Sequence, residues 1–422
     1  MNLSKVKVLA VVLTIATAAF AQFNDINNAR TRALNNAPLS DVTGVYSYPV
    51  LMMGYLNQAQ VTWNGTDAAS GGTGYGSFIF TKSINDMIAL GVVHNSVSFL
   101  SGSGAAAPGR LPNTPHFLLG FDLGALKLGV DIFIQHTDST TKVETVTPSV
   151  TAETKNSFTN FGTRFSADME FGDIGLLAKL GIGLPSTLEE VTYSNETPNT
   201  KIEFDGLYLE TGAELSYPLG DIDLTAGGEY INLSRQRKGN QPAPSDHLPY
   251  TKNSRALLAL YLAGEVNIME TAAAVFAYEY SRRTTTSEVA SGPSTEVRKT
   301  KTMDGIAAHS FYGGVENSWD DTWKFDNFQL RTGLGYDIRS VIYNQSNDRD
   351  NAETKRSEFS AHNFIKPIIG MGVSKGLLTL DMALSFGRMF DEGGVNGARD
   401  YDEWRGWLAG PTMVTTTATI KF

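Results

Sequence analysis

Apolar and polar residues alternate along most of the chain with a period of two. Along residues 160–171, one face carries apolar side chains such as Phe161 and Phe165, whereas the other face carries polar ones such as Arg164. Residues 328–339 repeat this pattern. Because successive side chains of a strand point to opposite faces, the alternation predicts strands with one apolar and one wet face.

The alternating segments are longer than the strands of most soluble proteins, which have about 5–6 residues. They match a strand that crosses a bilayer at a tilt, which needs about 9–11 residues. Backbone polar groups find no partners in lipid, so spanning strands must close into a barrel with an apolar outside and a polar inside. The pattern therefore predicts an all-β protein, a transmembrane antiparallel β-barrel.

Two kinds of connection alternate along the chain, as in bacterial outer-membrane barrels with short periplasmic turns and long external loops. The short turns are expected at Lys82–Asp86, Gly124-Ala125, Gly172-Asp173, Gly220-Asp221, Asn267–Glu270, Asp320-Asp321 and Lys375-Gly376. The long polar loops are expected near residues 64–73, 100–114, 138–156, 187–203, 234–253, 284–300, 343–356 and 390–411.

The number of loops predicts 14–16 strands, an even number. The first pair, near residues 56–63 and 75–81, decides between fourteen and sixteen. A repeat of about 48 residues would also suit a propeller. A propeller blade needs four short strands in each repeat, however, and only two long ones fit here.

The first residues predict export. Lys5 and Lys7 precede an apolar run over residues 8–18, and Ala19-Phe20-Ala21 forms a small-residue cleavage motif. These three parts are typical of a secretory signal peptide. We therefore expect the mature chain to begin near Gln22.

The last alternating segment places Ile420 and Phe422 on one face and threonines on the other. It resembles the C-terminal signal of outer-membrane barrels, which ends in Phe and is recognised by the barrel-assembly machinery. The resemblance implies that Ile420 and Phe422 form a membrane-insertion signal and that outer-membrane lipid surrounds the protein. The alternative is an ordinary edge strand that ends on Phe by chance.

The segment before the first strand contains Ala29-Arg30-Thr31-Arg32-Ala33-Leu34, then Pro38-Leu39-Ser40-Asp41, then Tyr48-Pro49-Val50-Leu51. It resembles the N-terminal hatch of the long-chain fatty-acid transporter (FadL-like) family, with Tyr48-Pro49-Val50 in place of that family's Asn-Pro-Ala. The resemblance implies a 14-stranded barrel with Tyr48, Pro49 and Leu51 in a hatch inside the lumen. It also implies passage of hydrophobic small molecules.

Three parts of the chain follow from these patterns. We expect a signal peptide at residues 1–21, a hatch or plug segment at 22–55 and the transmembrane β-barrel at 56–422. The alternative for the second part is a periplasmic tail without a plug role, because chain termini are often poorly ordered.

Composition excludes several classes of protein. The chain has 422 residues, a formal net charge of −10 and no cysteine. The missing cysteines exclude a disulfide scaffold and a thiolate metal site, and the acidic balance disfavours nucleic-acid binding. None of the six histidines lies in a recognised metal motif, and no G-x-S-x-G motif occurs. We expect no enzyme activity, cofactor or metal, and we interpret the histidines as girdle or loop residues.

Charged residues of both signs fall on the predicted lumen face, with acids in excess. Rings of charge tune ion passage, so this excess would favour cations weakly. The alternative is that ion pairs hold the wall and the hatch together. The lumen-lining candidates are Arg164, Asp168, Glu210, Glu214, Glu229, Arg331, Asp337, Arg339 and Asp381.

These features predict a barrel in the cell outer membrane for passive uptake of small, hydrophobic solutes. One alternative is a structural or assembly barrel whose external loops bind a partner protein. The loop at 390–411, where Trp404 and Trp407 are interleaved with charges, is the candidate contact. The other alternative is an open diffusion porin.

Overall fold

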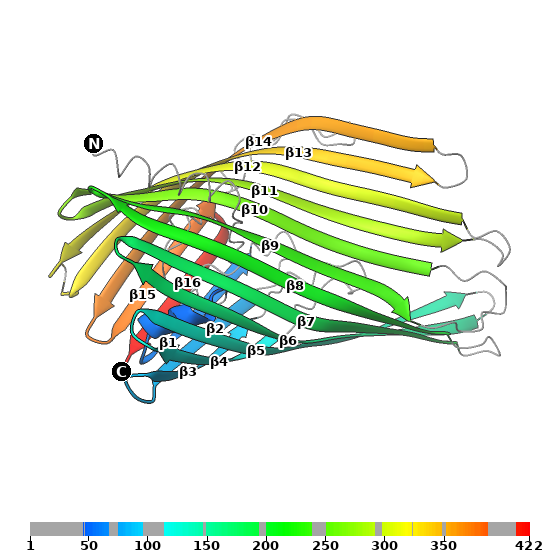
Figure 1. Ribbon diagram of the computed structural model, residues 1–422, viewed down its shortest axis with the longest axis horizontal. Coiled ribbons are helices and arrows are strands. Elements are labelled where there is room, and N and C mark those ends of the chain that lie inside the picture. The colour runs from blue at the N-terminus through cyan, green and yellow to red at the C-terminus, as the bar shows by residue number, and fades with distance from the viewer. Residues whose placement is uncertain are drawn as a thin grey trace.

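The computed structural model describes residues 45, 47–66, 75–95, 114–146, 149–193, 200–238, 250–291, 298–322, 324–347, 352–386 and 411–422. Within these ranges the chain forms sixteen antiparallel strands, each paired with its neighbours in sequence, and β1 also pairs with β16 (Figure 1). The sheet is thus a closed barrel. The expected signal peptide, the first part of the expected hatch and the loop at 390–411 lie outside the described residues, apart from the start of β16.

The strands are β1 Gln58–Thr66, β2 Tyr75–Ser83, β3 Ile88–Asn95, β4 Thr114–Asp122, β5 Leu126–Val146, β6 Ser149–Phe171, β7 Ile174–Tyr193, β8 Thr200–Leu219, β9 Ile222–Lys238, β10 Tyr250–Met269, β11 Ala272–Ser291, β12 Arg298–Asp320, β13 Asn327–Asn347, β14 Ala352–Lys375, β15 Leu378–Phe386 and β16 Pro411–Lys421. A 3-10 helix, η2, spans Pro49–Gly54 before the first strand.

The seven expected short turns are confirmed, and they lie together at one end of the barrel (Figure 1). Gly172, Gly220 and Gly376 in these turns have φ angles of +63°, +68° and +57°. Glycine adopts this region without the steric cost that a side chain brings, which explains its place at these tight reversals.

The strand number corrects one expectation. The family resemblance implied fourteen strands, but the described residues form sixteen, because β1 and β2 pair with each other and β1 closes the ring against β16. The propeller alternative is wrong for the same reason, since the strands share a single closed sheet.

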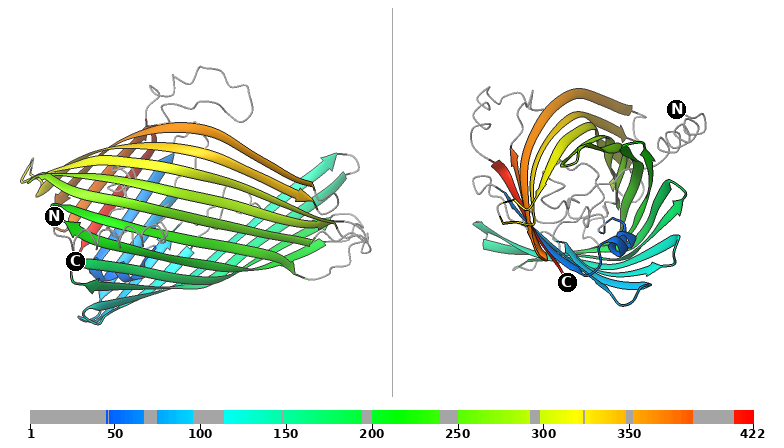
Figure 2. Two further views of the ribbon diagram at one scale, coloured as in Figure 1. Left: turned by 45° about the horizontal axis from the view of Figure 1, so that its top comes forward. Right: turned by 90° about the vertical axis from the view of Figure 1, so that its left-hand side faces the viewer.

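The barrel has two walls of unequal height (Figures 1 and 2). Strands β5–β14, which we call the tall wall, have 17 to 24 residues each. Strands β1–β4, β15 and β16, the low wall, have only 8 to 11. About ten residues suffice to cross a bilayer, so the tall wall extends well beyond one membrane surface.

The tall wall corrects the expected loops between residues 138 and 356, which are largely strand. The expected loop at 138–156, for example, is a hairpin of β5 and β6. Threonine is frequent there, and β-branched residues favour strands. Outside the bilayer both faces of a strand contact water. A strand there can carry polar residues on both faces and still pair with its neighbours. A run of polar residues alone therefore does not distinguish a loop from a strand in water, and the expectation of loops here is wrong.

The two faces of the wall have the expected polarity. Val61, Trp63, Phe165 and Leu334 point outward with about half of their surface exposed, whereas Arg164 on the alternate face is buried. An apolar outside and a polar inside suit a barrel surrounded by lipid.

No helix among the described residues is both long and apolar enough to cross a membrane.

The described part of the N-terminal segment lies inside the barrel (Figure 2, right). Helix η2 packs against β3, β4, β5 and β6. Val45 and Met52 are buried in a small core with Ile79, Val93 and Leu118 of the wall. The segment is therefore part of the packed interior, although its role as a hatch stays a prediction.

Candidate functional site in the lumen

One row of residues runs across the inner wall from β3 to β9. Each member is the direct cross-strand partner of the next, so the row is continuous. Most members toward the low wall are small, which leaves a shallow track along the wall. We call it the cradle row, and it consists of Ala89, Gly120, Gly129, Ser166, Lys179, Gly212 and Glu229.

The N-terminal segment lies along the cradle row. The backbone N–H of Val50 donates a hydrogen bond of 2.8 Å to Ser166 Oγ. A Cβ atom added at Gly129 would lie 2.1 Å from the Val50 nitrogen, and one at Gly120 would lie 2.5 Å from the sulfur of Met53. No side chain fits in such a space, so these glycines allow the segment to approach the wall.

Tyr48 occupies the other end of the row. The ammonium nitrogen of Lys179 lies 5.0 Å from the centre of the Tyr48 ring, a cation–π contact. A Cβ atom at Gly212 would lie 3.1 Å from the Tyr48 hydroxyl. Tyr48 is fully buried, Pro49 begins η2, and Leu51 is half-buried.

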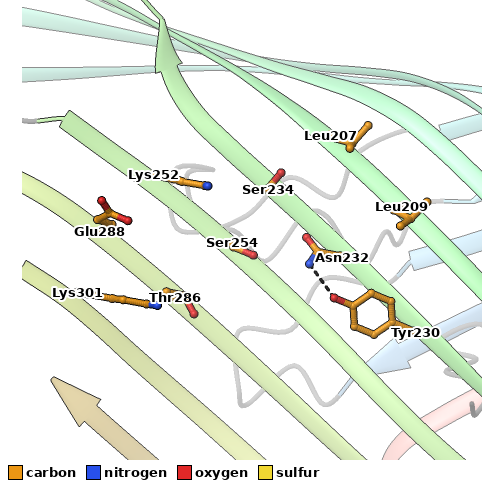
Figure 3. Close-up of a pocket in the computed structure, with 10 residues that line it drawn as sticks. All are labelled: Leu207, Leu209, Tyr230, Asn232, Ser234, Lys252, Ser254, Thr286, Glu288 and Lys301. Carbon is orange, nitrogen blue, oxygen red and sulfur yellow. Dashed lines mark hydrogen bonds between the residues drawn. The ribbon is translucent and has the colours of Figure 1, made fainter. Parts of the chain in front are cut away.

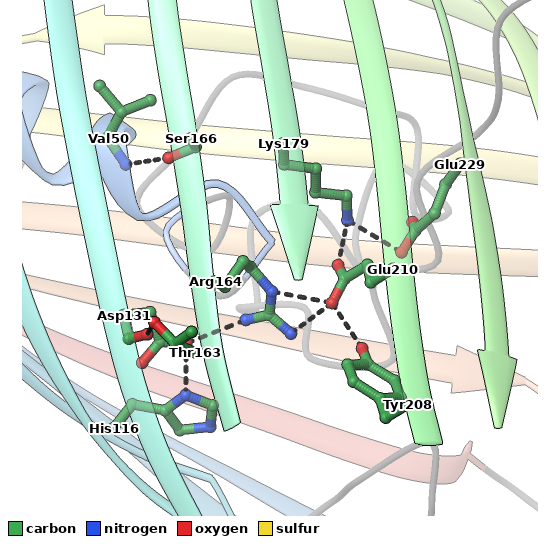
Figure 4. A network of polar contacts seen from close by, with 10 residues as sticks. All are labelled: Val50, His116, Asp131, Thr163, Arg164, Ser166, Lys179, Tyr208, Glu210 and Glu229. Atoms are coloured by element: carbon green, nitrogen blue, oxygen red, sulfur yellow. Dashed lines mark hydrogen bonds and ion pairs between the residues drawn. The ribbon is translucent and has the colours of Figure 1, made fainter. Parts of the chain in front are cut away.

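We call the part of the cradle row that contacts Tyr48 and Val50 the seat. A buried network of charges borders this seat (Figure 4). Arg164 Nε donates to Glu210 Oε2 at 2.8 Å, and a terminal guanidinium nitrogen of Arg164 contacts Asp131 at 3.1 Å. Lys179 donates to Glu210 at 2.5 Å and to Glu229 at 2.8 Å. Two cations thus bind three carboxylates, and the exposed fraction of the Lys179 side chain is 0%.

Two further groups complete the network. Tyr208 donates to Glu210 at 2.5 Å, and His116 Nδ1 lies 2.8 Å from Asp131 Oδ2. Carboxylates that are buried are costly unless they are paired and hydrogen-bonded, and Glu210 meets this condition with three donors.

Glycine lets these side chains reach across an intervening strand. Arg164 on β6 is opposite Gly181 on β7, which is opposite Glu210 on β8. Lys179 on β7 reaches Glu229 on β9 in the same way, over Gly212. A side chain at either glycine would meet these charged groups within 3.2 Å. The network therefore depends on the register of the sheet.

A second buried charge cluster lies on β12, β13 and β15. Arg331 donates to Glu316 at 2.5 Å and to Asp381 at 2.6 Å, and it also donates to Gln329. Gly372 on the intervening β14 again leaves the space, because a Cβ atom there would lie 2.4 Å from Asp381 Oδ1. This cluster stabilises the wall at a distance from the contacts made by Val50 and Tyr48.

The structure distributes the predicted lumen residues over several places. Arg164, Glu210 and Glu229 belong to one network, and Arg331 and Asp381 to the other. Asp168 pairs with Lys127 at 3.7 Å, and Glu214 accepts a hydrogen bond from Tyr261. Asp337 and Arg339 hold inward positions of β13, but their side chains lie outside the described part of the chain.

His116 corrects the interpretation of the histidines as girdle or loop residues. It is buried on the inner face of β4 beside Asp131. The available signal was the alternation through residues 114–122, which places His116 on the face of Leu118 and Gly120. Its partner could not be identified from sequence, because Asp131 lies on the next strand.

The end of the chain closes the ring. Thr62 and Thr417 share a hydrogen bond of 3.0 Å across the seam between β1 and β16. Ile420 points outward with half of its surface exposed, and Phe422 stacks on Phe80 with ring centres 5.7 Å apart. The role of Ile420 and Phe422 in membrane insertion stays a prediction.

An apolar cluster lies on the inner wall, one step further from the turns than the charge network. Its members have at most 6% of their surface exposed, and the rings of Phe133 and Tyr208 meet edge to face with centres 6.2 Å apart. We call it the inner apolar cluster, and it consists of Phe133, Tyr208, Ile231, Leu233 and Leu257. The packing of these side chains against one another keeps their apolar surface away from water.

No group of three or more histidine, aspartate and glutamate side chains in the described ranges could hold a metal ion.

Comparisons with known proteins give weak similarities. No family model matches the chain, and no curated sequence matches it. Among solved structures, CdiB from Escherichia coli is similar at a TM-score of 0.41 and 9% identity, over 86% of this chain. The present chain spans only 62% of the CdiB chain.

Two similar structures match this chain over nearly their whole length. The CymD monoaromatic hydrocarbon channel has a TM-score of 0.40 and 10% identity, over 95% of this chain and 99% of that chain. The toluene transporter TodX from Pseudomonas putida has a TM-score of 0.37 and 11% identity, over 93% and 96%. These values are too low to transfer a ligand or a mechanism. The closed antiparallel sheet with its apolar outside identifies the protein, on its own geometry, as a multi-pass β-barrel of the outer membrane.

Proposed function

We propose that the protein is a passive channel for small, hydrophobic solutes, whose bore is narrowed by the N-terminal segment on the cradle row. The observation that supports this most directly is the inner apolar cluster, which lies beside the buried charge network on the lumen wall. Ligand pockets for hydrophobic molecules combine such an apolar surface with a few fixed polar groups.

The state of the charges also supports the proposal. Arg164 and Lys179 are committed to Asp131, Glu210 and Glu229 through five short contacts. A cation that is already paired with a buried carboxylate attracts a passing ion weakly. The wall beside the seat of the segment therefore offers little to a hydrophilic ion, whereas a hydrophobic solute would contact the inner apolar cluster where its closely packed side chains move apart.

The test is uptake of the hydrophobic dye N-phenyl-1-naphthylamine by cells that carry the protein in their outer membrane. The intact outer membrane excludes this dye, and its fluorescence increases when it enters apolar surroundings. We expect faster uptake than in cells without the protein. Replacing Leu233→Asn should slow uptake by about tenfold, because one pocket contact is worth about 1–3 kcal/mol. The matched control is Leu377→Asn in an exposed turn, which should leave uptake unchanged.

The alternatives predict other outcomes. An open porin would admit the hydrophilic sugar raffinose in a liposome-swelling assay, and an assembly barrel would admit neither solute. Either result would contradict the proposal. Heat-modifiable migration on gels shows for each variant that the barrel is folded.

A further inference from the structure

A pocket of about 520 Å³ opens on the tall wall, with lining residues from β8 to β12 (Figure 3). It lies on the outer face. Tyr208 and Glu210 point into the bore, so Leu207 and Leu209, which alternate with them and line the pocket, point outward. The pocket is therefore separate from the lumen and from the proposed solute path.

The pocket begins where the apolar outer band ends. On β10 the outward positions Val266, Leu262 and Leu258 are apolar, and the outward positions Ser254 and Lys252 that follow are polar pocket residues. The apolar part from 258 to 266 has the length of a strand that crosses the hydrocarbon core, about 9–11 residues. The pocket thus begins just beyond the hydrocarbon core, on the side away from the turns.

Aromatic side chains lie on the turn side of the pocket, directly opposite Leu260 and Leu262 of β10. Tyr278 stacks on His309 with ring centres 6.1 Å apart, and Tyr280 lies 5.2 Å from His309. Aromatic belts of this kind lie at the interface between hydrocarbon and headgroups. The next outward residue on β11 is Arg282, whose Nε is buried and has no hydrogen-bond partner within the described residues. Arg282 is directly opposite Leu258 at the end of the apolar band, and an unmet guanidinium donor there suits an anionic ligand.

The charges of the pocket form a short ladder. Lys252 on β10, Glu288 on β11 and Lys301 on β12 are direct cross-strand neighbours. Lysine binds phosphate as a point charge, and a carboxylate accepts hydrogen bonds from sugar hydroxyls. Asn232 and Ser254 add neutral groups that can donate and accept.

We propose that this pocket binds the phosphorylated saccharide headgroup of a lipid in the outer leaflet. Lys252 and Lys301 contact a phosphate, and Glu288 and Asn232 contact sugar hydroxyls. Arg282 binds a second anionic group closer to the hydrocarbon. Free phosphate shares the anion chemistry, but a lipid also covers Leu207 and Leu209 and the apolar band below. A lipid is therefore the ligand that contacts both the polar pocket residues and the apolar residues beside them.

The test measures lipid binding to the full-length protein in detergent by native mass spectrometry. The probes are bis-phosphorylated lipid A, its dephosphorylated analogue and inorganic phosphate. We expect retention of the phosphorylated lipid alone. Replacing both lysines, Lys252→Gln with Lys301→Gln, should weaken its binding by about thirtyfold, because each basic residue near a charged lipid surface contributes about fivefold.

The matched control is Lys155→Gln, which removes an exposed, outward lysine from another part of the tall wall. This variant should bind the phosphorylated lipid as the unmodified protein does. Equal binding by the double variant would overturn the proposal, as would equal binding of the dephosphorylated lipid. Displacement of the lipid by millimolar inorganic phosphate would assign the site to free phosphate instead and would also overturn it.

Discussion

Two parts of the inner wall each contain buried basic residues that are paired with carboxylates. They differ in whether the N-terminal segment contacts those basic residues. The wall of β3–β9, which we call the cradle wall, has Arg164 and Lys179 beside the N-terminal segment. The wall of β12–β15, the far wall, has Arg331 with Glu316 and Asp381. In both walls a glycine on an intervening strand lets a cation reach a carboxylate two strands away.

On the far wall the buried charges have a structural role alone, whereas on the cradle wall they have a second role as well. On the far wall the ion pairs join strands. On the cradle wall the same device also forms a seat, because Lys179 holds two carboxylates and contacts Tyr48. Removing a buried cation from either wall should therefore lower the free energy of unfolding. Only its removal from the cradle wall should detach the N-terminal segment from the inner wall.

The largest expected effects come from removing one cation from each wall. Lys179→Met and Arg331→Met each leave buried carboxylates without their partner, which costs roughly 3–5 kcal/mol of unfolding free energy. Denaturant unfolding in lipid vesicles measures this loss. Planar-bilayer recordings should then show a higher conductance for Lys179→Met alone. A conductance increase in Arg331→Met would remove the distinction between the walls.

A smaller effect is expected at the glycines of the seat. Gly129→Ala places a methyl group 2.1 Å from the Val50 nitrogen, so the segment must shift away from Ser166. Overpacking of this kind costs about 1–3 kcal/mol, and it should appear as increased current fluctuation. In the control Gly313→Ala the nearest atom would lie 4.0 Å away. Identical recordings from the two variants would show that the segment is not seated on the row.

The aromatic contact contributes less. Tyr48→Leu removes a desolvated cation–π contact worth about 2 kcal/mol but keeps an apolar side chain at the site. Because the chain has no cysteine, Val50→Cys introduces a single reactive thiol. A bulky, water-soluble maleimide should label this thiol faster when Tyr48→Leu is also present. An unchanged labelling rate would mean that Lys179 does not hold the segment through Tyr48.

The smallest effect is expected at the turns that end the far wall. Asp326 accepts a hydrogen bond from the Gly376 backbone N–H and another from Lys375, and these bonds hold its pKa below the ordinary range for aspartate. A lowered pKa stabilises the fold above the unfolded-state pKa, and this contribution is lost as the pH falls through the folded-state value. Asp326→Asn should weaken the acid dependence of unfolding slightly. A clear increase in acid sensitivity would contradict this assignment.

The sequence predicts the barrel well, because alternation is a local signal. The faces of β6 and β13 and all seven short turns follow from neighbouring residues alone. The upper parts of β5–β14 do not, because polar strands in water lack the alternation that a bilayer imposes.

The seat could be predicted only in part. Arg164, Glu210 and Glu229 could be predicted as lumen residues, since the alternation places these charges on the polar inner face of the barrel. The role of Gly129, Gly181 and Gly212 depends on which residue stands opposite on the next strand. That register joins residues that are far apart in sequence, so no local pattern contains it.

The most direct test of the account is the conductance of the barrel with and without the N-terminal segment. Full-length protein and a variant that lacks Gln22–Met53 are reconstituted in planar bilayers after both show heat-modifiable migration. We expect small, closed-dominated currents from the full chain and steady, several-fold larger currents from the shortened one. Equal conductance of the two proteins would contradict the claim that the segment on the cradle row narrows the bore.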